Sequence, residues 1–130
     1  MSSKLLLQAR NYEKIYGDRI PASERPLFHV TPQIGWLNDP NGFSCYQGEY
    51  HLFYQYHLYN TSWGPMYWGH VKTKDFIRWE RLPAAMAPDA DYDNAGCFSG
   101  SALELPDKRH LRMYTGVQEW KREGGFTESR

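Results

Sequence analysis

Short runs of aromatic and β-branched residues, separated by Gly, Pro, Asn and Asp, fill the chain after Pro21. Such runs are typical of successive β-strands joined by tight turns. Aromatic residues make up 16% of the 130 residues, and most of them lie between Trp36 and Tyr114. Because aromatic side chains pack well on a pleated surface, this composition favours the same interpretation. The sequence therefore predicts an all-β region that begins after Pro21.

The first strands are predicted to form a four-stranded meander. The runs FSCY and EYHLFYQY flank Gln47-Gly48, a two-residue loop whose glycine can take the positive φ that a tight hairpin requires. In the second run, alternation places Gln55 on the face opposite to the tyrosines. A third strand is predicted at Tyr67 to Thr73, and a fourth around Ile77 to Arg81 after a turn near Lys74-Asp75.

A second set of strands is predicted near Cys97, with FSGSALEL and then HLRMYTGV after a turn at Pro106-Asp107-Lys108. The polar segment QEWKREGGFTESR follows and leaves this second meander incomplete. A repeat of four-stranded sheets is typical of a β-propeller, whose blades need their neighbours to cover both faces.

The first residues predict a different element, a short amphipathic helix over residues 4–16. Ser3 is the predicted N-cap, Gly17 stands in the stop position, and one stripe carries Leu5, Ala9, Tyr12 and Tyr16. The only apolar run here is three leucines long, too short for a secretion signal or a membrane span, so a cytoplasmic location without membrane contact is expected. Residues 1–24 are expected to be helix and linker, and residues 25–130 an incomplete β domain.

Charge and metal-ligand spacing exclude several kinds of partner. Lys plus Arg equals Asp plus Glu at 15 each, which leaves no basic field for nucleic acid. Cys45 and Cys97 are expected to be reduced and half-buried. The five histidines have no ligand spacing and are expected to pack in strands or lie on the surface, and the alternating aspartates of residues 89–93 are interpreted as a solvated turn. No metal and no cofactor is predicted.

The segment GWLNDPNG, from Gly35 to Gly42, carries the clearest functional signal. Asn-Asp-Pro-Asn-Gly alone is typical of a turn. Asp39, however, precedes a proline, which favours extended backbone, and it lies close after a tryptophan and among asparagines that can form hydrogen bonds. A carboxylate in such surroundings suits a sugar-binding pocket, where aromatic side chains also stack against sugar rings.

Six segments between Arg25 and Gly116 carry a family resemblance: RPLFHVTPQIGWLNDPNG, EYHLFYQY, WGPMYWGHVKTKDFIRWE, LPAAMAPD, YDNAGCFSGSA and MYTG. In their residues, order and spacing the chain resembles glycoside hydrolase family 32, the invertase and fructanase family, and especially its cytoplasmic sucrose-6-phosphate hydrolases. The resemblance implies the first blade and part of the second blade of a five-bladed β-propeller. It also implies a retaining β-fructofuranosidase acting on sucrose-6-phosphate or sucrose, with an exo-acting fructanase or a non-catalytic sugar-binding remnant as alternatives.

The resemblance also assigns roles to individual residues. Asp39 matches the nucleophile, which would form a covalent fructosyl-enzyme. Five further residues match positions that contact the fructosyl unit: Asn38, Gln55, Trp63, Phe98 and Ser99. The family's Arg-Asp-Pro triplet and its Glu-Cys pair, whose glutamate is the acid/base, do not occur in this chain.

Two expectations follow from these missing elements. The chain alone is expected to be inactive, because the residue that would protonate the leaving group is absent. An incomplete propeller exposes an apolar face and unpaired strand edges, so the chain is also expected to self-associate or to remain bound to the rest of its parent protein.

Overall fold

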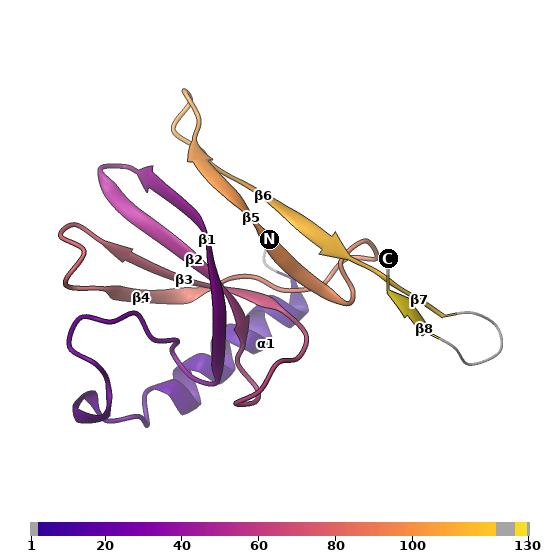
Figure 1. Ribbon diagram of the computed structural model, residues 1–130, viewed down its shortest axis with the longest axis horizontal. Coiled ribbons are helices and arrows are strands. Elements are labelled where there is room, and N and C mark those ends of the chain that lie inside the picture. Colours follow the sequence, from indigo (N-terminus) through magenta and orange to yellow (C-terminus); the bar gives the residue numbers. More distant parts are fainter. Residues whose placement is uncertain (1–2, 122–126, 130) are drawn as a thin grey trace.

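The computed structural model describes residues 3–121 and 127–129, and its largest element is a four-stranded antiparallel sheet (Figure 1). Strands β1 (Trp36–Tyr46), β2 (Glu49–His57), β3 (Tyr67–Thr73) and β4 (Glu80–Met86) lie in the order β1-β2-β3-β4. The predicted hairpin is confirmed, because Gln47 and Gly48 have φ angles of 50° and 78° and join β1 to β2. The predicted four-stranded meander is also confirmed.

The strands after this sheet form two hairpins. β5 (Gly96–Glu104) pairs with β6 (His110–Val117), and β7 (Glu119–Lys121) pairs with β8 (Thr127–Ser129). The predicted turn between β5 and β6 is confirmed, and Lys108 there has a φ of 69°. Part of the polar segment expected at the end, residues 122–126 and residue 130, lies outside the described residues. The chain is mostly β-sheet with a short N-terminal helix, and the propeller itself stays a prediction.

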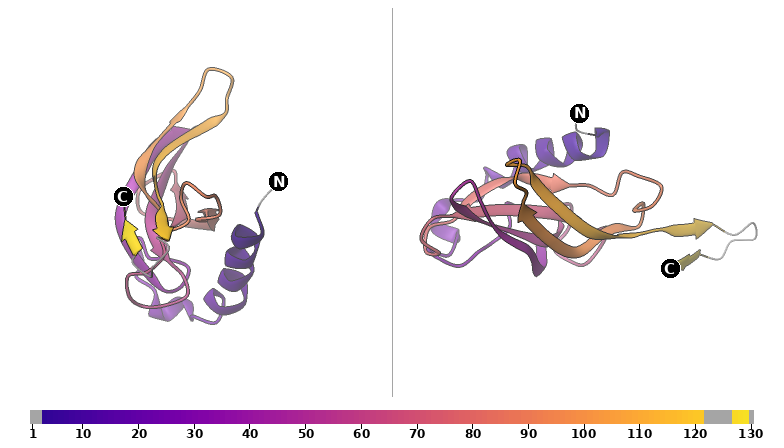
Figure 2. Two further views of the ribbon diagram at one scale, coloured as in Figure 1. Left: turned by 90° about the vertical axis from the view of Figure 1, so that its right-hand side faces the viewer. Right: turned by 90° about the horizontal axis from the view of Figure 1, so that it is seen from above.

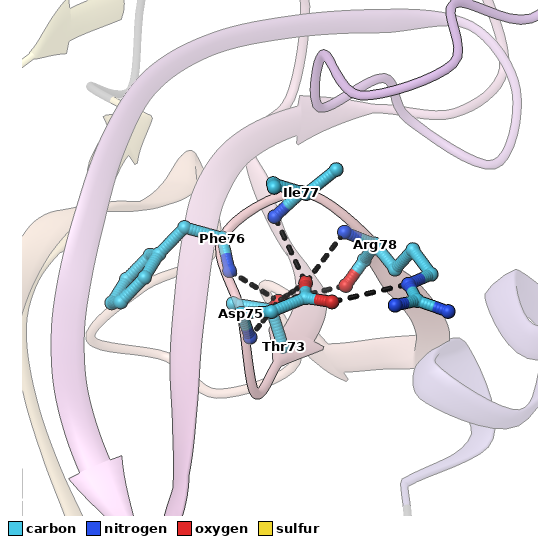
Figure 3. Close-up of polar contacts among 5 residues, drawn as sticks. All are labelled: Thr73, Asp75, Phe76, Ile77 and Arg78. Atoms are coloured by element: carbon cyan, nitrogen blue, oxygen red, sulfur yellow. Dashed lines mark hydrogen bonds and ion pairs between the residues drawn. The ribbon is translucent and has the colours of Figure 1, made fainter.

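The connection between β3 and β4 departs from the predicted pattern. The fourth strand was expected from Ile77 but begins at Glu80. The Asp75 carboxylate accepts hydrogen bonds from the backbone N–H groups of Ile77 (3.0 Å) and Arg78 (2.7 Å), as Figure 3 shows. Those bonds, chiefly the one from Arg78, lower the pKa of Asp75 to about 2. An aspartate side chain that accepts hydrogen bonds from the backbone N–H groups two and three residues later competes with strand pairing for those groups. This competition explains why β4 begins at Glu80 and not at Ile77.

Helix α1 (Lys4–Tyr12) begins as predicted, since the Leu6 N–H donates to the Ser3 hydroxyl oxygen at 3.1 Å. A π-helical turn (Glu13–Gly17) continues it, and a short 3₁₀ turn (Ala22–Glu24) follows. The predicted stripe is confirmed for Ala9, which is buried, and for Tyr12, which packs against the core, but it is wrong for Leu5 and Tyr16, which are exposed. Leu6 and Glu13 are buried instead. Within the described residues, no helix is long and apolar enough to cross a membrane.

A polar contact explains which face of α1 is buried. The Glu13 carboxylate accepts a hydrogen bond from the Ala84 N–H at 2.9 Å, and the Arg10 side chain donates to the Ala84 carbonyl oxygen at 2.9 Å. Both backbone polar groups of Ala84 in β4 are therefore bonded to the N-terminal helical segment, the N–H to Glu13 of the π-helical turn and the carbonyl oxygen to Arg10 of α1. Apolar periodicity could not reveal this face, because a glutamate lies at its centre.

The four-stranded sheet is covered on both faces. One face packs Tyr54 and Tyr56 of β2 against Leu6 and Ala9 of α1. On the other face Phe53 and Trp68 pack against Cys97 of β5, with further residues of β5 and β6 around them. Figure 2 shows α1 on one side of the strands. The predicted alternation along β2 is thereby confirmed, and it places Gln55 on the face toward β5.

Candidate active site

The Asn-Asp-Pro-Asn-Gly segment lies inside β1 and forms a bulged strand instead of a turn. Asn38 pairs with Gln55 and Pro40 pairs with Tyr54, so Asp39 has no partner of its own in the ladder. A residue in a β-bulge is left unpaired and the bulge redirects nearby side chains. Asp39 is exposed, and within the described residues no side chain is bonded to its carboxylate. An unpaired, accessible carboxylate is what a nucleophile requires.

Two hydrogen bonds between side chain and backbone hold this irregular part of β1. The Asn41 amide nitrogen donates to the Asp39 carbonyl oxygen at 3.2 Å, and the Ser44 hydroxyl donates to the Gly42 carbonyl oxygen at 3.2 Å. Gly42 has a φ of 57°, and a Cβ there would lie 2.7 Å from the Phe53 ring. These contacts hold the irregular backbone of β1 from Asp39 to Ser44.

Gln55 is buried, with 4% of its surface exposed, and it lies across the ladder from Asn38. Its amide nitrogen donates to the Cys97 carbonyl oxygen at 3.0 Å. One side of the Gln55 amide thus joins β2 to β5. Its predicted contact with a fructosyl hydroxyl would use the side-chain oxygen.

Trp63 lies in the connection between β2 and β3 and exposes 63% of its surface. Its two sequence neighbours, Ser62 and Gly64, both contact His57, the last residue of β2. The His57 Nδ1 lies 2.8 Å from the Ser62 carbonyl oxygen, and a Cβ on Gly64 would be 2.2 Å from the His57 ring. Because His57 pairs with Trp36, Trp63 is held near the start of β1.

Phe98 and Ser99 lie at the start of β5, which is attached to the start of β3. The Cys97 N–H donates to the Met66 carbonyl oxygen at 2.9 Å, and the Trp68 indole donates to the Phe98 carbonyl oxygen at 3.1 Å. Ser99 is exposed at a second ladder irregularity, between Phe98 and Gly100. Phe98 is half-buried.

All six predicted site residues therefore lie at one end of the first sheet, where β1, β3 and β5 begin and β2 ends. Asn38 and Gln55 are cross-strand partners, and Gln55 is bonded to the residue before Phe98. Asp39, Asn38, Trp63 and Ser99 are exposed there. Their individual roles stay predictions.

A buried carboxylate close to this end was not predicted. Asp93, expected in a solvated turn, is only 1% exposed. It accepts hydrogen bonds from the Tyr114 hydroxyl at 2.6 Å and the Ala90 N–H at 2.8 Å. Cys97 was expected to be half-buried but is fully buried, and burial beside Asp93 raises the pKa of its thiol. Both cysteines are free thiols, and Cys45 is exposed.

Three of the histidines form a cluster between the two larger sheets. The His51 Nδ1 and the His70 Nε2 lie 2.8 Å apart, and the His110 Nε2 lies 2.8 Å from the Ser44 hydroxyl. Burial, together with the neighbouring positive groups, lowers the pKa of His70 to about 3. Within the part of the chain that the structure describes, no group of three or more His, Cys, Asp or Glu side chains is placed to bind a metal ion. Linear spacing could not reveal this cluster, because it depends on how β2, β3 and β6 meet.

Comparison with known proteins identifies the family. Residues 29–127 match the glycosyl hydrolases family 32 N-terminal domain. The chain is 52% identical over 116 residues to the sucrose-6-phosphate hydrolase of Zymomonas mobilis, and the aligned region covers 88% of this chain and 22% of that protein. It is also 56% identical over 79 residues to the levanase of Bacillus subtilis, covering 61% of this chain and 11% of the levanase.

Solved structures agree with the sequence match. A variant of the Bombyx mori GH32 β-fructofuranosidase BmSUC1 in complex with sucrose superposes with a TM-score of 0.81 at 36% identity, covering 99% of this chain and 26% of that one. The sucrose-6-phosphate hydrolase of Lactobacillus gasseri gives a TM-score of 0.70 at 36% identity, with coverages of 99% and 25%. The chain thus spans about a quarter of these enzymes, and it belongs to glycosyl hydrolase family 32, within the N-terminal domain of that family.

Proposed function

We propose that this chain carries the nucleophile side of a retaining β-fructofuranosidase whose substrate is sucrose-6-phosphate or sucrose. The observation that supports this most is Asp39, which lies within the segment that matches family 32 and stands unpaired and exposed in a bulge of β1. The 52% identity with the Zymomonas mobilis sucrose-6-phosphate hydrolase supports the substrate class.

In the proposed mechanism a carboxylate oxygen of Asp39 attacks the anomeric carbon of the fructosyl unit. The bond from that carbon to the leaving oxygen breaks, and the leaving oxygen takes a proton from an acid on the opposite side. Water then attacks the fructosyl-enzyme, gives its proton to the same acid/base and releases Asp39. The transition state resembles an oxocarbenium ion, so the ionised Asp39 also stabilises positive charge as it develops.

The other site residues would bind and orient the sugar. Asn38 and Gln55 would bond fructosyl hydroxyls, while Trp63 and Phe98 would exclude water from the apolar ring face and Ser99 would add a further contact. The acid/base glutamate has no counterpart in this sequence, so we expect the 130 residues alone to show no sucrose hydrolysis. General acid catalysis typically contributes ~10²- to 10⁴-fold.

An exo-acting fructanase is the second candidate. The 56% identity with a levanase and the structural match to a fructan 1-exohydrolase from Cichorium intybus solved in complex with 1-kestose, at a TM-score of 0.62 and 34% identity over 81% of this chain and 19% of that one, support it. The residues discussed above would hold the fructosyl unit in either case. A non-catalytic sugar-binding remnant is less well supported, because such a module has no need of Asp39.

A hybrid enzyme tests the proposal. In this hybrid, residues 29–127 replace the matching segment of the Zymomonas mobilis sucrose-6-phosphate hydrolase. We expect the hybrid to hydrolyse sucrose-6-phosphate and sucrose, and Asp39→Asn to remove activity while leaving thermal unfolding unchanged. Asp107→Asn, at an exposed surface ion pair with Arg109, is the matched control and should stay active. A hybrid that keeps its activity after Asp39→Asn would show that the assignment is wrong, and a preference for levan over sucrose would favour the fructanase.

A further inference from the structure

Asn41 is an unusual residue to find inside the bulged strand. Its side chain is buried, with 9% of the residue exposed, and its amide nitrogen donates to the Asp39 carbonyl oxygen. Its side-chain oxygen is also buried and has no hydrogen-bond partner among the described residues. A buried oxygen without a partner destabilises a folded chain, so an apolar side chain would serve stability better at this position. The amide is retained here for some other reason.

We propose that Asn41 is a positioning residue for Asp39, and that it acts by fixing the backbone that aims the Asp39 carboxylate. The proposal rests on the proposed function of Asp39. Asp39 has no ladder partner of its own, because the register moves from Asn38 directly to Pro40. Pro40 has no backbone N–H, so the peptide between Asp39 and Pro40 cannot be held by a ladder hydrogen bond from its nitrogen. The Asn41 side chain supplies a donor to this peptide from two residues further along.

The next part of β1 contains the same kind of hydrogen bond, from a side chain to the carbonyl oxygen two residues earlier, made by a different residue type. Ser44 also donates to the carbonyl oxygen two residues before it, in Gly42, at the same distance of 3.2 Å. Ser44 is in turn held by His110 of β6. A serine side chain can therefore reach across two residues in this strand, which makes serine the natural replacement for testing position 41.

The matched pair Asn41→Ala and Asn41→Ser in the hybrid enzyme tests the proposal, since the two variants differ only by one hydroxyl group. Displacing a reacting group by about 1 Å can cost ~10²-fold in rate. We expect Asn41→Ala to lower kcat by that order with little change in KM, and to slow formation of the fructosyl-enzyme. Asn41→Ser should recover most of the lost kcat.

The outcomes separate this proposal from the proposed function. If Asp39→Asn leaves hydrolysis intact, the proposed function fails. If Asp39 is required but the Ala and Ser variants have the same kcat, or if Asn41→Ala raises only KM, the positioning role is wrong while the function stands. A purely structural role would lower the thermal stability of both variants without the difference in kcat. Should Asn41→Ala fail to fold, an Asn41→Ser variant that folds but loses kcat as Asp39→Asn does would equally overturn the positioning role.

Discussion

The amide nitrogen of Gln55 on β2 donates a hydrogen bond to the carbonyl oxygen of Cys97 on β5 at 3.0 Å. Gln55 is also the cross-strand partner of Asn38, the residue before Asp39. Gln55 therefore links β1, its ladder neighbour and the strand that carries the proposed nucleophile, to the β5–β6 hairpin through its side chain. This relationship explains how residues separated by some sixty positions reach one end of the sheet.

Replacing Gln55 with methionine should destabilise the chain and loosen the attachment of the β5–β6 hairpin to β2. Methionine has a similar length but cannot donate to the Cys97 carbonyl oxygen, which would be left without this partner. We expect the free energy of unfolding to fall by about 1–3 kcal/mol, measured by urea denaturation. Gln8→Met on the exposed side of α1 is the control and should change it by less than about 0.5 kcal/mol. Equal stability of the two variants would show that the bond to Cys97 contributes nothing.

The docking of α1 should depend on the shape of Glu13 more than on its charge. Burial raises the pKa of Glu13, although the bond from the Ala84 N–H opposes this, so removing the charge is not costly. Glu13→Gln keeps an acceptor for the Ala84 N–H and should leave the free energy of unfolding within about 1 kcal/mol of its starting value. Glu13→Leu removes the acceptor and should lower it by about 1–3 kcal/mol. Thermal melts that rank the two variants in the opposite order would contradict this account.

The histidine cluster should make the free energy of unfolding fall as the pH is lowered. The pKa of His70 is about 3 in the folded chain and 6.5 in its ordinary state. Between these values the unfolded chain binds a proton that the folded chain does not, so stability is lost as pH falls from about 6.5 toward 3. A shift of this size corresponds to a loss of at most about 5 kcal/mol.

The His70→Gln variant should show a flatter dependence of the free energy of unfolding on pH over that range. His29→Gln, at an exposed histidine, should retain the original slope. Urea denaturation at several pH values measures both. A His70→Gln variant with the original slope would mean that other groups control the acid transition. His51, His110, Lys72 and Arg112 all lower the pKa of His70. Lys72 and Arg112 stay charged over this range, so the protonation of His51 and His110 is what can alter the curve.

The expected self-association stays a prediction, and the outer face of the β5–β6 hairpin gives it a test. Leu103, Leu111 and Met113 expose 42%, 37% and 53% of their surfaces there. Sedimentation should show the 130-residue chain as a dimer or larger species, and Leu111→Lys with Met113→Lys should shift it toward monomer. Leu27→Lys, at a leucine that is 93% exposed elsewhere, should not. A compact monomer at all concentrations would contradict the expectation.

Local pattern predicted those parts of the fold that local interactions determine. The Gln47-Gly48 turn and the alternation along β2 depend on neighbouring residues, and both were predicted correctly. The start of β4 was not, because the Asp75 carboxylate bonds the backbone of Ile77 and Arg78 and delays the strand.

The candidate site was predictable only through family resemblance. Turn chemistry alone would have placed Asp39 in a loop, whereas pairing with β2 draws it into a bulged strand. The burial of Asp93 depends on Tyr114 of β6, and the contact between His51 and His70 depends on the cross-strand register of β2 and β3. The spacing of residues along the sequence does not predict either contact.

Trapping the covalent intermediate tests the central claim most directly. The hybrid enzyme would be quenched with acid during turnover of sucrose, digested, and examined by peptide mass spectrometry. The account predicts a fructosyl group on the peptide that contains Asp39, carried by the Asp39 side chain and absent from the Asp39→Asn variant. A fructosyl group on any other residue of an enzyme that turns over sucrose would contradict it.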